Sequence, residues 1–200
     1  MTAEAAPQDA PQVTPVSKFR TRTQTNRLGL WLFIVSDSFL FGGLYMARFY
    51  LLGTNTRPDV NQLLGLTVTA VLLVSSFFVN RAETAASYGD RKTFLRSILI
   101  TLVLGVLFLI GVVGVEWQIA PFGTADGAAA SLFYTMTGFH AFHVLTGVVF
   151  LFVIYNNGRK GKYGPEDHWP VEAAAVYWHF IDVVWIFFYP ALYLIGAPII

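Results

Sequence analysis

Three histidines and an aspartate lie inside two strongly apolar segments in the C-terminal half of the chain. His140 and His143 stand three residues apart in the first segment, and His179 and Asp182 stand three residues apart in the second. Residues three apart share one face of a helix, so each pair can meet a common partner. Because a centrally placed Asp costs about 2.5–3.5 kcal/mol on membrane-insertion scales, we expect function or specific assembly to depend on these side chains.

Two kinds of chemistry are open to these four residues. The three imidazoles could together bind a metal ion, or each could form a hydrogen bond across a tight helix interface, which is the better-supported use. We therefore predict no metal site. His179 and Asp182 could share a proton within a relay, or they could form a satisfied polar contact that locks their helix to a neighbour. The residues alone leave that second choice open.

Two further carboxylates lie in apolar surroundings. Asp37 comes nine residues into the first apolar segment, which is about 14 Å along a helix and close to the middle of a bilayer. Gly42 and Gly43 follow it, and small side chains let helices approach closely, so we expect Asp37 to face protein. Glu116 ends the third apolar segment beside Trp117, where we expect an interfacial carboxylate within reach of water.

Two tryptophans and a fourth histidine complete the set of candidates. Trp178 and Trp185 are seven residues apart, next to His179 and Asp182. We expect both indoles to pack between helices or to anchor the chain at a membrane surface. His168 lies in a polar connection and is not a candidate for a site inside the membrane.

The composition indicates an integral membrane protein. Of the 200 residues, 55% are hydrophobic and 12% are charged, about half the charged content of roughly 25% in soluble domains. There is no cysteine, so this chain alone forms no disulfide, no cysteine-ligated iron–sulfur cluster and no two-cysteine copper site. Runs of about 20 apolar residues cross a bilayer as helices, and five are present: Leu28 to Tyr50, Gln62 to Val79, Ile98 to Trp117, Ala128 to Tyr155, and Glu172 to Ile195.

These segments predict an all-α membrane protein with five transmembrane helices in one bundle, formed by residues 28–200. Residues 1–27 are rich in Pro, Gln, Ala and Thr, and we expect a flexible cytoplasmic arm without a cleavable signal peptide. Five spans would put 11 of the 13 Lys and Arg residues on the side of the N-terminus. By the positive-inside rule, the N-terminus is then cytoplasmic and the C-terminus lies outside.

Six strings of residues, in this order, resemble one family. They are Trp31 to Phe41 (WLFIVSDSFLF), Leu73 to Phe77 (LVSSF), Glu116-Trp117, Ala120-Pro121-Phe122, Thr137 to Gly147 (TGFHAFHVLTG) and Tyr177 to Trp185 (YWHFIDVVW). The chain is similar to subunit III of the haem-copper respiratory oxidases from roughly Leu28 to Gly196. The last two strings are the most specific.

The resemblance implies a non-catalytic core subunit of a proton-pumping cytochrome c oxidase in the plasma membrane of a prokaryotic cell. Haems and copper are then expected in partner subunits and not in this chain. The expected partners are subunit I as the main contact, subunit II, small accessory subunits and membrane phospholipids, with no nucleic acid. The family's polar positions match Asp37, Glu116, His140, His143, His179 and Asp182, for which the resemblance implies buried hydrogen bonding and not electron transfer. For the subunit as a whole, the resemblance implies phospholipid binding and support of proton uptake.

Two departures from the family pattern keep alternatives open. Asp37 stands where many members have Glu, and an Asp there resembles the quinol-oxidase branch. Long members have seven helices, so their lipid cleft is incomplete in a five-helix chain unless another subunit supplies helices or lipids bind an open face. The alternatives are a quinol oxidase subunit, a nitric-oxide-reductase accessory protein and, more remotely, a proton-coupled transporter that uses Asp37, His179 and Asp182.

Overall fold

The computed structural model describes the backbone of residues 15–199 and the side chains of residues 23–198. Within this part of the chain, five helical spans are long and apolar enough to cross a membrane, which confirms the predicted all-α, five-helix architecture. The elements in chain order are α1 Pro15–Leu52, β1 Thr56–Pro58, α2 Gln62–Ser87, α3 Arg91–Leu109, the π-helix η1 Ile110–Glu116, α4 Trp117–Ile119, α5 Ala128–Arg159, α6 Trp169–Tyr189, the π-helix η2 Pro190–Leu194 and β2 Ala197–Ile199.

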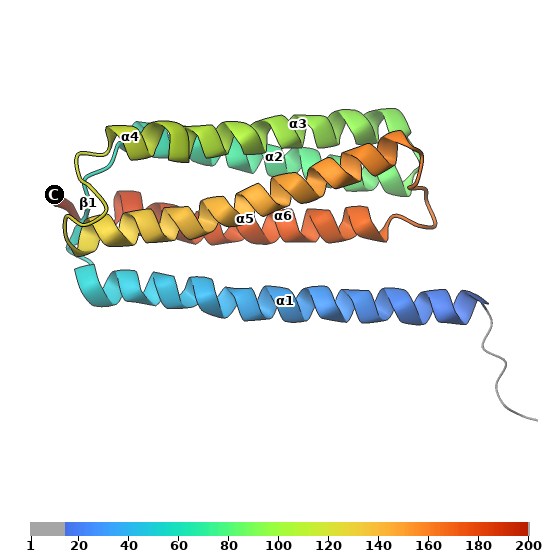
Figure 1. Cartoon of the computed structure of the whole chain (residues 1–200), viewed down its shortest axis with the longest axis horizontal. Helices are drawn as coiled ribbons and strands as arrows, with labels where there is room; N and C mark the ends of the chain where they lie inside the picture. The colour runs from blue at the N-terminus through green and yellow to red at the C-terminus, as the bar shows by residue number, and fades with distance from the viewer. Residues whose placement is uncertain (1–14, 200) are drawn as a thin grey trace, which may run out of the picture.

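The long helices form three layers (Figure 1). The first contains α2 and α3, the second contains α5 and α6, and α1 alone forms the third and packs on α5 and α6. The connections α2–α3 and α5–α6 lie at the same end of the bundle as the start of α1. The basic connections therefore share one end, as the positive-inside reading of the sequence requires.

Polar caps set where two of the helices begin. The Asn61 side chain accepts a hydrogen bond from the Leu64 backbone N–H at 3.1 Å and starts α2, and Asp90 accepts one from the Thr93 N–H at 3.1 Å and starts α3. The bond from Thr93 holds the pKa of Asp90 below its usual value. Gly89, with φ of 74°, makes the tight turn before it. These caps satisfy backbone N–H groups that have no partner within a helix.

The predicted boundary of the N-terminal arm differs from the structure. Residues 1–14 lie outside the described residues, but α1 already begins at Pro15, so residues 15–27 are helical. Proline is favoured at the first position of a helix. Lys, Arg and Gln, which follow it, are good helix formers, so the helix begins well before its apolar part.

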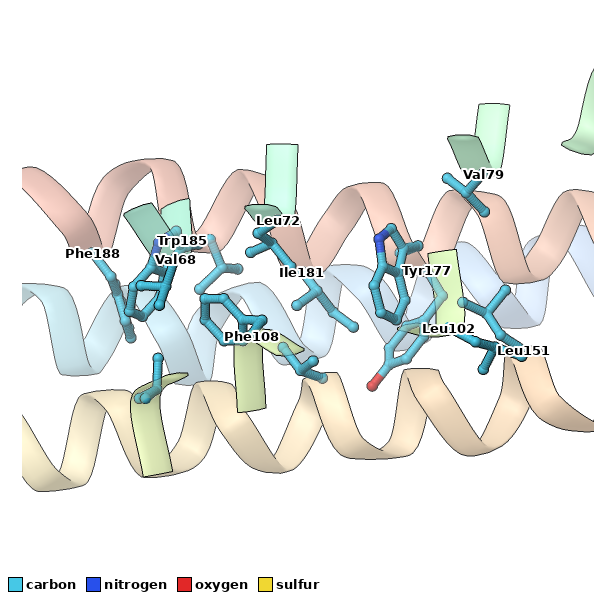
Figure 2. Packing of buried hydrophobic residues seen from close by; sticks show 14 of the residues in the cluster. Val68, Leu72, Val79, Leu102, Phe108, Leu151, Tyr177, Ile181, Trp185 and Phe188 are labelled. Atoms are coloured by element: carbon cyan, nitrogen blue, oxygen red, sulfur yellow. The ribbon is translucent and has the colours of Figure 1, made fainter. Parts of the chain in front are cut away.

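The core lies where α2, α3, α5 and α6 meet, and Figure 2 shows Leu72, Phe108, Ile181 and Trp185 gathered there. Close approach depends on Gly105 and Gly147. A Cβ on Gly105 would come within 2.6 Å of the Trp178 ring, and one on Gly147 within 3.0 Å. The expectation that Gly42 and Gly43 bring helices together is wrong for this chain's own helices, because a Cβ on either would meet nothing within 4 Å.

Candidate functional site

The first polar contact inside the bundle joins α1 to α5. Asp37 Oδ2 lies 3.1 Å from His143 Nε2, and the two side chains are 13% and 11% exposed. The Oδ2 atom is buried but not aligned for a hydrogen bond with any described residue, so the short distance, rather than bond geometry, defines this contact. Asp37 faces protein, as predicted, although the glycines after it do not cause this.

The other contacts of His143 fix its tautomer. Its Nδ1 lies 2.6 Å from the Phe139 carbonyl oxygen, which can only accept, so Nδ1 carries a proton. One further proton, on His143 Nε2 or on Asp37, then leaves the pair with no net charge, which lowers the cost of burying it. Beside this pair, the hydroxyl groups of Tyr177 and Thr146 are hydrogen-bonded to each other at 2.8 Å.

The second polar contact joins α2 to α6 through Ser76. The Ser76 hydroxyl donates to Asp182 Oδ2 and lies 2.8 Å from His179 Nδ1. Which atom donates between Ser76 and His179 Nδ1 depends on the tautomer of the imidazole. His179 and Asp182 therefore share a partner on the neighbouring helix, which is the arrangement that a contact locking α6 to α2 requires. A proton relay through them remains untested.

Both tryptophans lie in the interior, so the alternative of surface anchors is wrong. The Trp178 indole N–H donates to Ser75 Oγ at 2.9 Å, and the Trp185 indole N–H donates to Thr69 Oγ1 at 2.9 Å. Both rings are almost fully enclosed. With the bonds of Ser76 included, three residues of α2 therefore form hydrogen bonds to α6.

Glu116 is buried, which corrects the expectation of an interfacial carboxylate in reach of water. Its residue is 1% exposed, and the Tyr193 hydroxyl donates to its Oε2 at 2.7 Å. Glu116 ends η1, where the wider π-helical turn replaces the α-helical one. Such turns often occur at functional sites. The wider turn changes which way the residues that follow it face around the helix axis, and hydropathy does not reveal this change.

His140 and His143 share a helix but have different surroundings. His140 is fully buried, its ring lies 4.7 Å from Trp185, and neither of its nitrogens has a hydrogen-bond partner among the described residues. His143 instead faces Asp37 on α1. Across the described residues, no three His, Cys, Asp or Glu side chains gather closely enough to hold a metal ion.

Arg48 is a buried cation that was not among the residues predicted to have a role. It is 0% exposed. Its guanidinium donates to the carbonyl oxygens of Ala191 at 2.6 Å, Thr56 at 2.7 Å and Ile195 at 2.8 Å, and also to that of Gly53. It thereby ties the end of α1 to the C-terminal segment. The sequence signal that could have identified Arg48 is its position within an apolar segment, close to the end of that segment.

Comparison with known proteins gives a consistent result. Residues 17–197 match the family model described as cytochrome c oxidase subunit III. The chain is 38% identical over 184 residues to cytochrome c oxidase subunit 3 of Dasypus novemcinctus, across 86% of this chain and 70% of that protein. With the same coverage, it is 37% identical to the protein of that name from Bos taurus and 38% identical to the one from Gadus morhua.

Proposed function

Because this membrane chain belongs to the cytochrome c oxidase subunit III family, we propose that it is a non-catalytic core subunit of a proton-pumping cytochrome c oxidase. In this role it stabilises subunit I, binds phospholipid and supports proton uptake, while partner subunits hold the haems and copper. Subunit II and small accessory subunits complete the set of partners.

The observation that carries this proposal is the use of the ionisable residues inside the membrane. Asp37 with His143 connects α1 to α5, and Ser76 with His179 and Asp182 connects α2 to α6. A chain whose costly polar groups hold helices together is suited to the role of a scaffold.

Phospholipid binding is supported by two grooves beside α1. One, of about 450 Å³, lies between α1 and α5 and is lined by residues such as Phe33, Phe142 and Phe150. The other, of about 350 Å³, lies between α1 and α6 and includes Phe41 and Phe187. Their linings are almost entirely apolar, which suits acyl chains. We propose that lipids or helices of another subunit cover α1 on these sides.

A mild-detergent pull-down through a C-terminal tag tests the proposed function. We expect haem and copper to arrive with larger membrane subunits, detected by an optical spectrum and metal analysis. A colourless, metal-free chain recovered alone from membranes that contain the oxidase would contradict the proposal, and transport activity of that chain in liposomes would identify a transporter instead.

A quinol oxidase subunit of the same fold is the second candidate, and Asp37 is the observation that favours it. The same purified complex separates the two candidates. Copper in excess of the single active-site atom, together with oxidation of cytochrome c, supports the first. Copper limited to that atom, together with oxidation of quinol, supports the second.

We propose the plasma membrane of a prokaryotic cell as the location, with the N-terminus in the cytoplasm. The support is the gathering of basic connections at one end of the bundle (Figure 1). Fractionation of the source cell, followed by protease treatment of sealed vesicles of each orientation, tests this. Cleavage of the N-terminal region only from the outer side would contradict it.

A further inference from the structure

A stripe of polar side chains follows the line where α2 and α6 meet. On α2, Ser76, Asn80 and Glu83 recur at helical spacing and are at least partly exposed. On α6, Glu172, His179 and Asp182 face the same line. We call these six residues the polar stripe. In Figure 1, α3 and α5 lie in front of α2 and α6.

The central part of the stripe lies deep in the membrane. His179 comes ten residues after the start of α6 at Trp169 and fifteen before the end of that span at Leu194. At about 1.5 Å per residue, it is roughly 15 Å from one end and 22 Å from the other. Lipid headgroups lie outside a hydrocarbon core that is about 30 Å thick, so they do not reach this depth.

Hydrogen-bonding capacity remains unused at this depth. His179 Nδ1 is hydrogen-bonded to Ser76, whereas its Nε2 has no partner among the described residues and is not enclosed by them. Asp182 is 3% exposed, and its Oδ1 also lacks a partner there. Acyl chains offer no donor or acceptor, so contact with lipid would leave the Nε2 atom unsatisfied at a cost in free energy.

The two glutamates at the end of the polar stripe indicate what kind of partner could bind there. Glu172 is paired with Arg27 at 2.9 Å, but Glu83 forms no ion pair within the described chain. Glu83 lies near the cytoplasmic end of α2, where membrane proteins carry most of their Lys and Arg. A helix with a basic residue at its cytoplasmic end and a hydrogen-bonding side chain near its middle would complement both Glu83 and His179.

We propose that the polar stripe is the docking surface for a transmembrane helix of another oxidase subunit, which presents a side chain that forms a hydrogen bond with His179 Nε2. This inference rests on the proposed function and adds which face of the bundle the partner covers. The α1 side differs in chemistry, because its grooves are almost wholly apolar and suit acyl chains.

Site-specific photo-crosslinking in the intact oxidase, within its native membrane, tests the docking surface. We would replace Leu73 or Ile186, which flank the stripe and are 43% and 49% exposed, with p-benzoylphenylalanine. Matched controls at Val103 of α3 and Val149 of α5, 52% and 56% exposed, line an apolar groove between these two helices, away from α2 and α6. We expect covalent products with another oxidase subunit from the first two positions and lipid adducts from the controls.

The other possible results of the cross-linking experiment would overturn the docking surface alone or the proposed function as well. Lipid adducts alone at Leu73 and Ile186, or cross-links to a second copy of this chain, would overturn the docking surface while haem in the same complex upholds the proposed function. Absence of haem from the complex would overturn both. As a second measurement, His179→Leu should lower the recovery of partner subunits severalfold, whereas His179→Gln, which keeps a hydrogen-bonding side chain, should restore it.

Discussion

At the scale of single residues, the contact between Asp37 and His143 is the one most suited to handling protons, because it places a carboxyl oxygen 3.1 Å from an imidazole nitrogen. Asn in place of Asp37 keeps the size of the side chain but cannot take up or release a proton. We expect Asp37→Asn to leave the haem spectrum of the complex normal, while turnover falls and becomes more sensitive to pH. Asp37→Glu should restore turnover, and steady-state activity unchanged across pH would limit Asp37 to a structural role.

The buried carboxylate of Glu116 depends on a single donor. Tyr193→Phe removes that donor and leaves Glu116 without a partner among the described residues, which typically costs about 1–3 kcal/mol. We expect a lower unfolding temperature, measured by tryptophan fluorescence in detergent. Adding Glu116→Gln should recover part of the loss, because a neutral amide is cheaper to bury. Equal and additive losses from the two substitutions would show that the hydrogen bond contributes little.

The sequence predicted which residues are polar and buried better than it predicted their partners. Asp37, His143, His179 and Asp182 could be identified because ionisable groups are rare in apolar runs. Ser76 and Thr69 could not, since hydroxyl residues are common in membrane helices and only tertiary contact gives them a role. The alignment of Asp37 with His143 depends on how α1 lies along α5, which periodicity does not encode.

At the scale of elements, Gly105 and Gly147 are two of the glycines that allow close packing, and both face Trp178. Gly105→Ala would place a Cβ 2.6 Å from the Trp178 ring and 2.9 Å from Val148, and such overpacking costs about 1–3 kcal/mol. We expect lower thermal stability of the detergent-solubilised subunit. Gly42→Ala is the matched control, because its Cβ would meet nothing within 4 Å. Similar effects of both substitutions would contradict this account of the packing.

Hydropathy predicted the five spans because a bilayer demands long apolar helices. It did not predict where α1 begins, since Pro15 and the basic residues after it form helix without being apolar. It also did not predict η1, η2 or the parallel pairing of β1 with β2. These features depend on contacts between distant segments, among which the bonds of Arg48 are the most direct.

At the scale of the whole molecule, α1 is the helix least enclosed by the others. Within its described side chains, only Ile34, Phe41 and Arg48 are buried, at intervals of seven residues, which is the narrow seam of a helix with a single contact line. The remaining four spans are better enclosed. Attachment of α1 therefore relies on this seam and on whatever covers its grooves.

Arg48 contributes four hydrogen bonds to that seam. We expect its substitution to affect mainly the segments that these bonds connect. Arg48→Met leaves four backbone carbonyls without their donor, at a cost of about 1–3 kcal/mol for each one that water cannot reach. We expect faster hydrogen exchange at the end of α1 and in residues 190–199, with little change in α3 and α5. Arg48→Lys should give an intermediate effect, because a compact ammonium group cannot donate to as many carbonyl oxygens as a guanidinium. Uniform acceleration across all five spans would mean that Arg48 supports the entire bundle rather than the attachment of α1.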